Sequence, residues 1–409
     1  MARLIIKSSK LKGRVKVSGS NNSALRILIG SLLTKEEVIL KNIPDTLDTK
    51  EIINIMKELG VKVDIGDNIT IKADKLKNKI SKKYNTRVAL LFLAPLLSRT
   101  KYALIPPPND KLGKKSYDLH LFALKMMGVS FINRDDDWIE AKCEKLKGAT
   151  IIFPQKTTGG TENIILAACL AKGKTKIINA NIRPEIYDLI RFLNKLGADI
   201  KIKGSGIIEI NPVKELKGGK YKIIPDSIEA MTFLIGALIT KSKIIISNFP
   251  FTDLKISLDV LRASGVKYKR VLSNMFIEDS DMTGFEIATG VFPMINTDIQ
   301  PILTLLATQI TGVSKITDIR FRERWQYIGQ LQSLGARIGI NYDTIDMDGG
   351  QRLRGEIIGA TDAKSGIALI LGGLVCYDKT IIGNIEAIDR GYERIDEKFR
   401  KLGADIIRE

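Results

Sequence analysis

The strongest constraint on the fold is a segment that occurs six times along the chain. In one copy, residues 331–348, it reads LQSLGARIGINYDTIDMD, which is the pattern of a helix end, a glycine, a strand, a polar turn and a second strand. Successive glycines are separated by 68, 69, 68, 70 and 68 residues, so six periods account for all 409 residues. A fixed period of this kind identifies a repeat architecture. The glycines are Gly60, Gly128, Gly197, Gly265, Gly335 and Gly403.

The first half of each repeat contains an unusually apolar helix pattern, such as RVALLFLAPLL from Arg87 or TENIILAACLA from Thr161. A helix that is apolar nearly all round is buried, whereas the later helix of each repeat mixes charge with an apolar stripe and is expected nearer to solvent. Three units whose buried helices meet at a common axis, with the sheets outside, would cover every apolar face. The sequence therefore predicts an α/β protein of six βαβαββ-type units in two lobes of three, an inside-out α/β barrel pair.

The polar starts of the buried helices are expected to point into a cleft between the two lobes. Helix N-termini favour anions, because backbone N–H groups and the helix dipole both attract negative charge. The chain carries a net charge of +18, which favours phosphorylated small molecules or polyanions as ligands. Nucleic acid is the first alternative, but the lysines are scattered and aromatic residues make up only 6% of the chain, so base-stacking surfaces are scarce.

Other classes of protein are disfavoured by composition. No run of eighteen apolar residues predicts a membrane span, and the N-terminus lacks the apolar stretch of a signal peptide. Three widely separated cysteines favour a reducing cytoplasm over a disulfide framework or a zinc site. His120 is the only histidine, which excludes a His-rich metal site and leaves a Ser-His-Asp triad possible but without other support.

Several short motifs stand at the ends of predicted elements. The turn SGSNNS from Ser18 opens the first apolar helix, Asp298 lies in the first turn of the fifth, and TDAKS from Thr361 opens the sixth. The loop PPPNDKLGKK, residues 106–115, is either a lid or a linker. Each motif also has a plain structural interpretation, since cap residues of this kind are common at helix starts.

The segments SGSNNSAL, TENIILAA, RPEIYD, NTDIQ and IDRGYERI resemble those of the enolpyruvyl transferases, and the resemblance extends over the whole chain. TENI and DRGYERI favour the branch of this family that uses UDP-N-acetylglucosamine as acceptor. The resemblance implies the same inside-out barrel pair, with one lobe at residues 22–226, the other at 1–21 and 227–409, and an active site in the cleft between them.

The reaction that the resemblance implies is enolpyruvyl transfer. The 3-hydroxyl of the acceptor adds to C2 of phosphoenolpyruvate while C3 takes a proton, and the resulting tetrahedral ketal loses phosphate to give an enol ether. The implied context is peptidoglycan precursor synthesis by a cytoplasmic monomer. The implied partners are phosphoenolpyruvate and a UDP-sugar, without metal, organic cofactor, nucleic acid or membrane.

The resemblance also assigns roles to individual residues. Asp110 stands at the loop position of the proton donor, Asp298 at that of the carboxylate facing the acceptor hydroxyl, and Asn22 at that of the asparagine that holds the acceptor. The implied cations around phosphoenolpyruvate and the cleft are Arg87, Lys115, Arg324, Lys364 and Arg390. The implied nucleotide-binding end of the loop is Lys115, Ser116, Tyr117, Asp118 and Leu119.

Six positions depart from the family pattern, two of which are Arg320 and Arg322 in place of a neutral and an acidic residue. Asn21 occupies the place of a catalytic lysine, and an amide can neither carry positive charge nor transfer a proton. Lys115 and Lys364 stand where arginine is usual, which keeps the charge but loses the bidentate fork. Arg183 stands where glutamate is usual, on the acceptor side. Two alternatives therefore stay open: transfer to another nucleoside or nucleotide, and a catalytically impaired paralogue that binds a nucleotide sugar.

Overall fold

The computed structural model describes residues 2–86, 88–107, 117–134, 137–320 and 325–409. It contains two compact units. The N-terminal unit comprises Gly19–Pro44 and Asp48–Ile224, and the C-terminal unit comprises Met1–Ser18, Asp45–Leu47 and Pro225–Glu409. The expected active site between two lobes stays a prediction.

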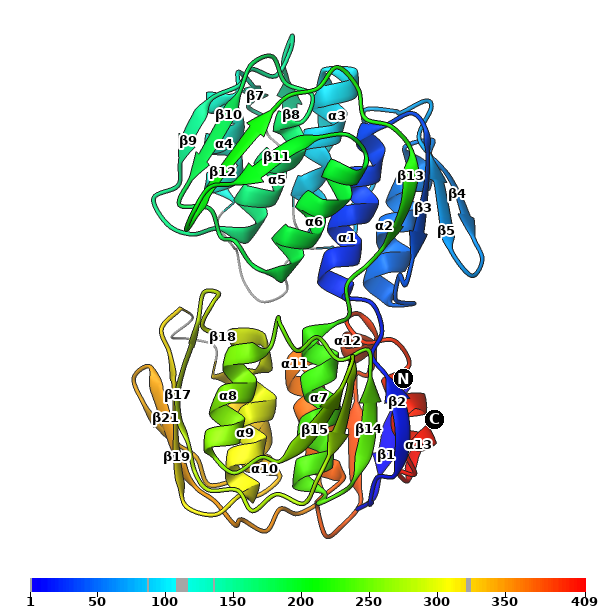
Figure 1. Cartoon of the computed structure of the whole chain (residues 1–409). Helices are drawn as coiled ribbons and strands as arrows, with labels where there is room; N and C mark the ends of the chain where they lie inside the picture. Colours follow the sequence, from blue (N-terminus) through cyan, green and yellow to red (C-terminus); the bar gives the residue numbers. More distant parts are fainter. Residues whose placement is uncertain (1, 87, 108–116, 135–136, 321–324) are drawn as a thin grey trace. The chain divides into compact units, whose positions relative to one another are not determined.

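The N-terminal unit has three sheets around a group of buried helices (Figure 1), with strand orders β13-β3-β5-β4, β6-β8-β7 and β11-β12-β10-β9. The third repeat, β9-α5-β10-α6-β11-β12, follows the predicted order of elements without exception. In the second repeat the first strand is reduced to a parallel bridge between Lys79 and Leu104. The helices are α1 (Asn21–Gly30), η1 (Ser31–Leu33), α2 (Leu47–Glu58), η2 (Ala89–Phe92), α3 (Leu93–Thr100), α4 (Asp118–Met126), α5 (Thr158–Ala168) and α6 (Pro184–Lys195). The strands are β3 (Glu37–Lys41), β4 (Lys62–Ile65), β5 (Ile69–Lys72), β6 (Tyr102–Ile105), β7 (Ser130–Ile132), β8 (Ile139–Lys142), β9 (Thr150–Ile152), β10 (Thr175–Ile178), β11 (Asp199–Ile202), β12 (Ile207–Asn211) and β13 (Gly219–Lys222).

The C-terminal unit repeats this plan, with sheets β15-β16-β14-β2, β18-β17-β19-β21-β20 and β22-β23-β1-β24. The helices are α7 (Ser227–Ile239), α8 (Lys255–Ala263), η3 (Thr297–Ile299), α9 (Gln300–Gln309), α10 (Gln326–Ser333), α11 (Ala363–Gly373), α12 (Glu386–Asp389) and α13 (Ile395–Lys401). The strands are β1 (Leu4–Ile6), β2 (Gly13–Lys16), β14 (Ile244–Ser247), β15 (Tyr268–Val271), β16 (Asn274–Ile277), β17 (Glu286–Gly290), β18 (Ile295–Asn296), β19 (Val313–Asp318), β20 (Gly339–Asn341), β21 (Thr344–Asp348), β22 (Ile357–Gly359), β23 (Thr380–Gly383) and β24 (Ile406–Arg408).

Two strands leave the repeat to which they belong in sequence. β2 directly precedes α1, yet it pairs in parallel with β14 of the C-terminal unit. β13 directly precedes α7, yet it pairs in parallel with β3 of the N-terminal unit. β1 pairs antiparallel with both β23 and β24, so this strand lies in the middle of the sheet of the sixth repeat.

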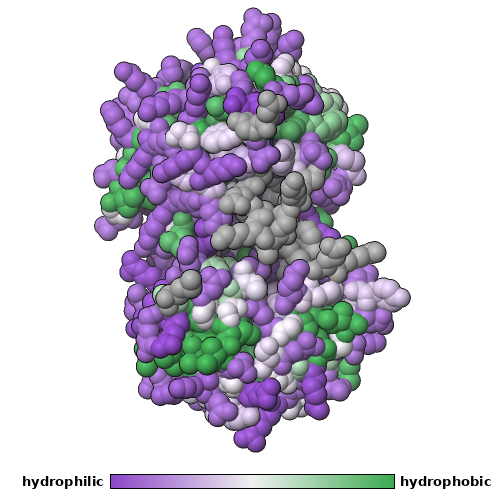
Figure 2. Space-filling view, turned by 180° about the vertical axis from the view of Figure 1, so that it is seen from behind, coloured by the Kyte–Doolittle hydropathy of each residue, from purple (hydrophilic) through white to green (hydrophobic). Residues whose placement is uncertain are grey.

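The predicted burial of the apolar helices is confirmed. Residues 300–308 of α9 are buried, as are residues 229–237 of α7, 365–373 of α11 and 160–168 of α5. Each unit has its own hydrophobic core built around these helices. Hydrophilic side chains cover most of the molecular face shown in Figure 2. No helix in the described part of the chain is long and apolar enough to cross a membrane.

The six marker glycines all have the backbone conformation that their position predicts. Their φ angles are 87° for Gly60 and Gly128, 100° for Gly197, 102° for Gly265, 90° for Gly335 and 93° for Gly403. This left-handed conformation is strained for residues with a Cβ atom and free for glycine. The glycine therefore ends the second helix of each repeat and turns the chain towards the following strand.

We predict that Gly197→Ala destabilises the protein by about 1–2 kcal/mol, the cost of a left-handed L-residue. A Cβ atom at Gly197 would meet no atom within 4 Å, so the loss reports backbone strain alone. Gly66→Ala in the same unit is the matched control, because its φ is not in this region and its nearest contact is 4.0 Å away. Gly265→Ala should cost more, because its Cβ would lie 2.2 Å from the Asp281 carbonyl oxygen. Urea unfolding of the three variants checks this ranking, and equal stability of Gly197→Ala and Gly66→Ala would contradict it.

Candidate functional site

In the C-terminal unit, polar residues gather at the N-termini of three buried helices that pack against one another, α7, α9 and α11. Asp226 caps α7 by accepting hydrogen bonds from two backbone amides at 2.8 and 3.0 Å. Asn296 caps the η3 turn that leads into α9. Asp362 caps α11 in a capping box with Ser365. These caps satisfy backbone donors that burial would otherwise leave without partners.

Asp298 and Lys364 are two predicted site residues that the structure brings together. The side chain of Asn296 caps the start of η3, so the Asp298 carboxylate does not serve as the cap. Lys364, in the first turn of α11, donates from Nζ to Oδ1 of Asp298 in a direct ion pair. The Lys364 side chain is 26% exposed and that of Asp298 is 14% exposed, so the pair is shielded but not sealed from solvent.

The DRGYERI segment packs onto the same end of α11. Gly391 lies against Ala363, because a Cβ atom built on Gly391 would be 3.2 Å from the Ala363 Cβ. Tyr392 is buried, and its hydroxyl lies 3.2 Å from Oγ1 of Thr232 on α7. Arg390 follows α12 in this segment and is half-buried. The segment therefore joins α7 to α11 beside the Asp298–Lys364 pair.

A second charged cluster in this unit was not predicted from the sequence. Lys398 donates to Oγ of Ser18 at 2.5 Å and to Oε1 of Glu229 at 2.5 Å. The Ser18 backbone amide donates to Glu229 at 2.6 Å, and its hydroxyl donates to Glu393. Glu393 also accepts from the backbone amide of Asp45 at 2.9 Å. Ser18, in SGSNNS, and Glu393, in DRGYERI, belonged to motifs, but Lys398 and Glu229 carried no sequence signal that linked them to Ser18.

This cluster anchors the chain where it passes between the two units, since Ser18 and Asp45 both lie at unit boundaries. Burial raises the pKa of Glu229 to about 7, although Lys398 acts in the opposite direction. Burial also acts to raise the pKa of Glu393, but the hydrogen bonds from Ser18 and Asp45 outweigh it and the pKa is lowered. The pKa values of Glu229 and Glu393 are thus shifted in opposite directions, although both carboxylates form an ion pair with Lys398.

In the N-terminal unit, α1 and α5 present polar groups at their N-termini. Ser20 caps α1, with its Oγ 3.3 Å from the Ser23 amide, and Asn21 is the buried first residue of the helix. Arg26 donates to the Asn22 carbonyl oxygen at 2.8 Å and to Glu162 of α5 at 3.0 Å. Arg26 therefore links the backbone of Asn22 to α5. Burial raises the pKa of Glu162 even though Arg26 lowers it.

His120 of α4 lies against the first turn of α5. Nδ2 of Asn163 lies 3.2 Å from Nδ1 of His120 and donates to the Leu90 carbonyl oxygen at 3.0 Å. A Cβ atom on Gly159 would lie 2.6 Å from Nε2 of His120, so only glycine fits there. Burial lowers the pKa of His120 to about 4. The imidazole is therefore neutral at pH 7 and supports this turn; no catalytic triad partner contacts it among the described residues.

The remaining predicted residues are only partly placed. Tyr117 precedes α4, Asp118 is its exposed first residue, and Leu119 packs against the core of the N-terminal unit. The structure does not bring these three residues into a described contact with Asn21 or Asn22. The predicted residues outside the described part of the chain are Arg87, Asp110, Lys115, Ser116 and Arg324.

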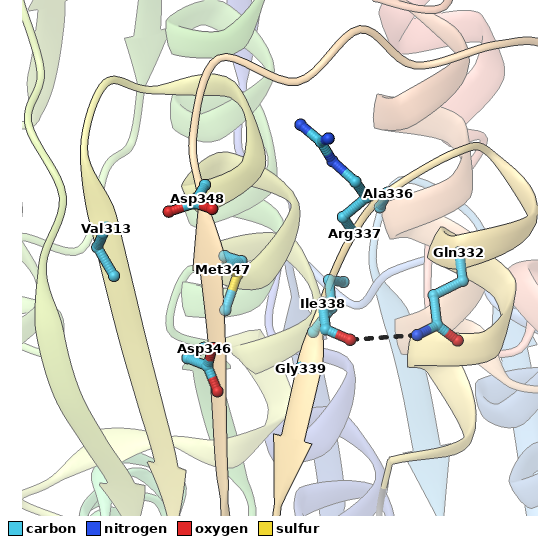
Figure 3. A pocket seen from close by; sticks show the side chains of 9 residues that line it. All are labelled: Val313, Gln332, Ala336, Arg337, Ile338, Gly339, Asp346, Met347 and Asp348. Carbon is cyan, nitrogen blue, oxygen red and sulfur yellow. Dashed lines mark hydrogen bonds between the residues drawn. The ribbon is translucent and has the colours of Figure 1, made fainter.

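A hollow of about 570 Å³ lies in the C-terminal unit between α10 and the edge of the β20–β21 hairpin (Figure 3). Gln332 donates to the Ile338 carbonyl oxygen at 3.2 Å on one side of it. Asp346 and Asp348 lie on the β21 side. None of the predicted site residues lines this hollow, so it gives no support to the predicted chemistry.

Sequence comparison relates the whole chain to known proteins. The family model EPSP synthase (3-phosphoshikimate 1-carboxyvinyltransferase) matches residues 5–399. UDP-N-acetylglucosamine 1-carboxyvinyltransferase 1 of Carboxydothermus hydrogenoformans is 37% identical over 99% of this chain and 97% of its own. UDP-N-acetylglucosamine 1-carboxyvinyltransferase of Solidesulfovibrio magneticus is 34% identical over 100% of both chains.

Solved structures show the same fold. The enolpyruvyl transferase NikO from Streptomyces tendae matches with a TM-score of 0.89 at 21% identity, covering 100% of this chain and 98% of that one. EPSP synthase from Acinetobacter baumannii matches with a TM-score of 0.82 at 18% identity, covering 100% of both chains. The fold is thus the predicted inside-out α/β barrel of six repeated units. The chain belongs to the EPSP synthase family of enolpyruvyl transferases, which confirms the resemblance found in the sequence.

We predict that His120 titrates near pH 4 in the folded protein and near its ordinary value of about 6.5 in the unfolded chain. Because the folded state binds this proton less tightly, this group should lower stability as pH falls from 6.5 towards 4. The chain has one histidine, so a ¹H–¹³C NMR titration follows one ring signal. The chain in urea is the control, and a folded midpoint at or above 6.5 would refute the burial argument.

Proposed function

We propose that this protein transfers the enolpyruvyl group of phosphoenolpyruvate to the 3-hydroxyl of UDP-N-acetylglucosamine and releases phosphate. The observation that carries the proposal is the end-to-end similarity to several proteins named UDP-N-acetylglucosamine 1-carboxyvinyltransferase, at 34–37% identity. The proposed role belongs to peptidoglycan precursor synthesis, in the cytoplasm, and the proposed state is a monomer without cofactor.

The C-terminal unit supports the proposal through its chemistry. The Asp298 carboxylate can accept the proton of the attacking hydroxyl, and the cations Lys364 and Arg390 can stabilise the negative charges of phosphoenolpyruvate. The N-termini of α9 and α11 add backbone dipoles that favour anions. In this proposal Asn22 holds the acceptor, Tyr117, Asp118 and Leu119 bind its nucleotide, and Asn21 takes the place of a catalytic lysine.

A second candidate is transfer to a different nucleotide acceptor. Arg183 is the N-cap residue of α6, and Glu185 holds its guanidinium in a two-point ion pair, Nε to Oε2 at 2.6 Å and Nη2 to Oε1 at 2.9 Å. A fixed guanidinium where the family usually has a carboxylate changes the charge offered to an acceptor. A catalytically impaired nucleotide-sugar-binding paralogue is the remaining alternative, because Asn21 cannot transfer a proton.

We expect phosphate release from phosphoenolpyruvate only when UDP-N-acetylglucosamine is present. A coupled phosphate assay with UDP-N-acetylglucosamine, UDP, UMP or no acceptor separates the candidates. Release with UMP alone would favour the second candidate. No release with any acceptor, together with calorimetric binding of UDP-N-acetylglucosamine, would favour the paralogue.

We expect Asp298→Asn to lower kcat on the order of a hundredfold or more, because the amide cannot accept the hydroxyl proton. Asp259→Asn is the matched control, since Asp259 forms an exposed ion pair with Lys255 at 2.6 Å on the surface of the same unit. Thermal unfolding should show both variants folded. Wild-type kcat in Asp298→Asn would remove this residue from the proposed chemistry.

A further inference from the structure

The proposed reaction requires a group that gives a proton to the departing phosphate. The acceptor hydroxyl loses a proton during addition, and inorganic phosphate gains one when the C2–O bond to phosphate breaks. Asn21, the buried first residue of α1, cannot supply it, because a neutral amide has no proton to release at accessible pH. Another group must therefore supply the proton.

Lys364 has the chemistry for this task. Its ammonium group can release a proton and recover it, whereas an arginine guanidinium stays protonated in proteins. Its Nζ atom is already hydrogen-bonded to Oδ1 of Asp298, so a proton can pass between the two groups along an existing contact. Asp298 lies in η3, which leads directly into α9, and α9 packs against α11, the helix that carries Lys364, so the pair is fixed in position.

We propose that Lys364 is the proton donor to the leaving phosphate and that Asp298 reloads it; this inference rests on the proposed function. In the addition step, the hydroxyl oxygen bonds to C2, its proton moves to Asp298, and C3 takes a proton from a separate acid. In the elimination step, C3 returns that proton, the C2–O bond to phosphate breaks, and Lys364 protonates the departing oxygen. The neutral amine then takes the proton held by Asp298. The hydroxyl proton thus ends on phosphate, and both side chains return to their starting states.

Two simpler roles make different predictions. If the pair only joins α11 to η3, removal of Lys364 lowers stability but any cation that pairs with Asp298 restores activity. If Lys364 only neutralises phosphate charge, arginine serves equally well. Of the three roles, only that of proton donor requires a side chain that can lose its proton.

The first test is Lys364→Arg, which keeps the charge and can pair with Asp298. We expect kcat to fall on the order of a hundredfold, with KM for phosphoenolpyruvate within about threefold of the parent. Lys255→Arg is the matched control, because Lys255 forms an exposed ion pair with Asp259 in the same unit. Thermal unfolding confirms that each variant is folded. Parental kcat in Lys364→Arg overturns the proposal.

The second test is chemical rescue of Lys364→Ala by added ethylammonium-type amines and by guanidinium. We expect the amines to restore turnover, with faster rescue by more acidic ammonium ions, and guanidinium to restore little, since general acid catalysis follows the acidity of the donor. Equal rescue by guanidinium, or rescue independent of amine pKa, means that charge alone is required and overturns the proposal. An inactive parent protein would remove the proposed function and this inference together, whereas an active parent with an equally active Lys364→Arg removes only the inference.

Discussion

The structure depends on the complete burial of its apolar helices. Helices such as α7, α9 and α11 bury almost every side chain, so their flanks carry no charged residue beyond the first turn. The backbone amides at their first turns have no partner within the helix, so they must be capped or bound by a ligand. The charged residues of these helices lie in their first turns, as Lys364 does in α11, and Asp298 lies in the η3 turn that leads into α9.

Much of the fold could be predicted from the sequence because its signals are local and repeated. The left-handed backbone at Gly197 follows from a glycine at a helix end, and the buried state of α9 follows from a helix without a polar side. Six copies of one pattern then specify the α/β class, since each repeat must bury the same faces. The same kind of local pattern predicted that Asp298 lies at the start of a buried helix.

The contacts between distant segments could not be predicted in this way. Lys364 and Asp298 are 66 residues apart. The repeat predicts that the buried helices of one lobe meet at a common axis, but it does not show which side chains at their starts pair. Lys398 contacts Ser18 across 380 residues, and the pairing of β2 with β14 joins Gly13 to Ile244. Such contacts depend on the whole path of the chain, so residue types alone do not encode them. The same holds for Arg26, whose ion pair with Glu162 became visible only when α1 and α5 were placed together.

The exchange of β2 and β13 sets an order of assembly during synthesis. A ribosome delivers the chain from its N-terminus, and the described strands of the N-terminal unit are complete once β13 at Lys222 has emerged. β2, made near the beginning, has its partner β14 only when Ser247 has been made, and β1 waits for β23 and β24 near the end of the chain. The first strands made are thus among the last to be paired. Residues 4–16 thus stay unpaired while the strands of the N-terminal unit are completed, and the C-terminal unit closes on strands made before that unit.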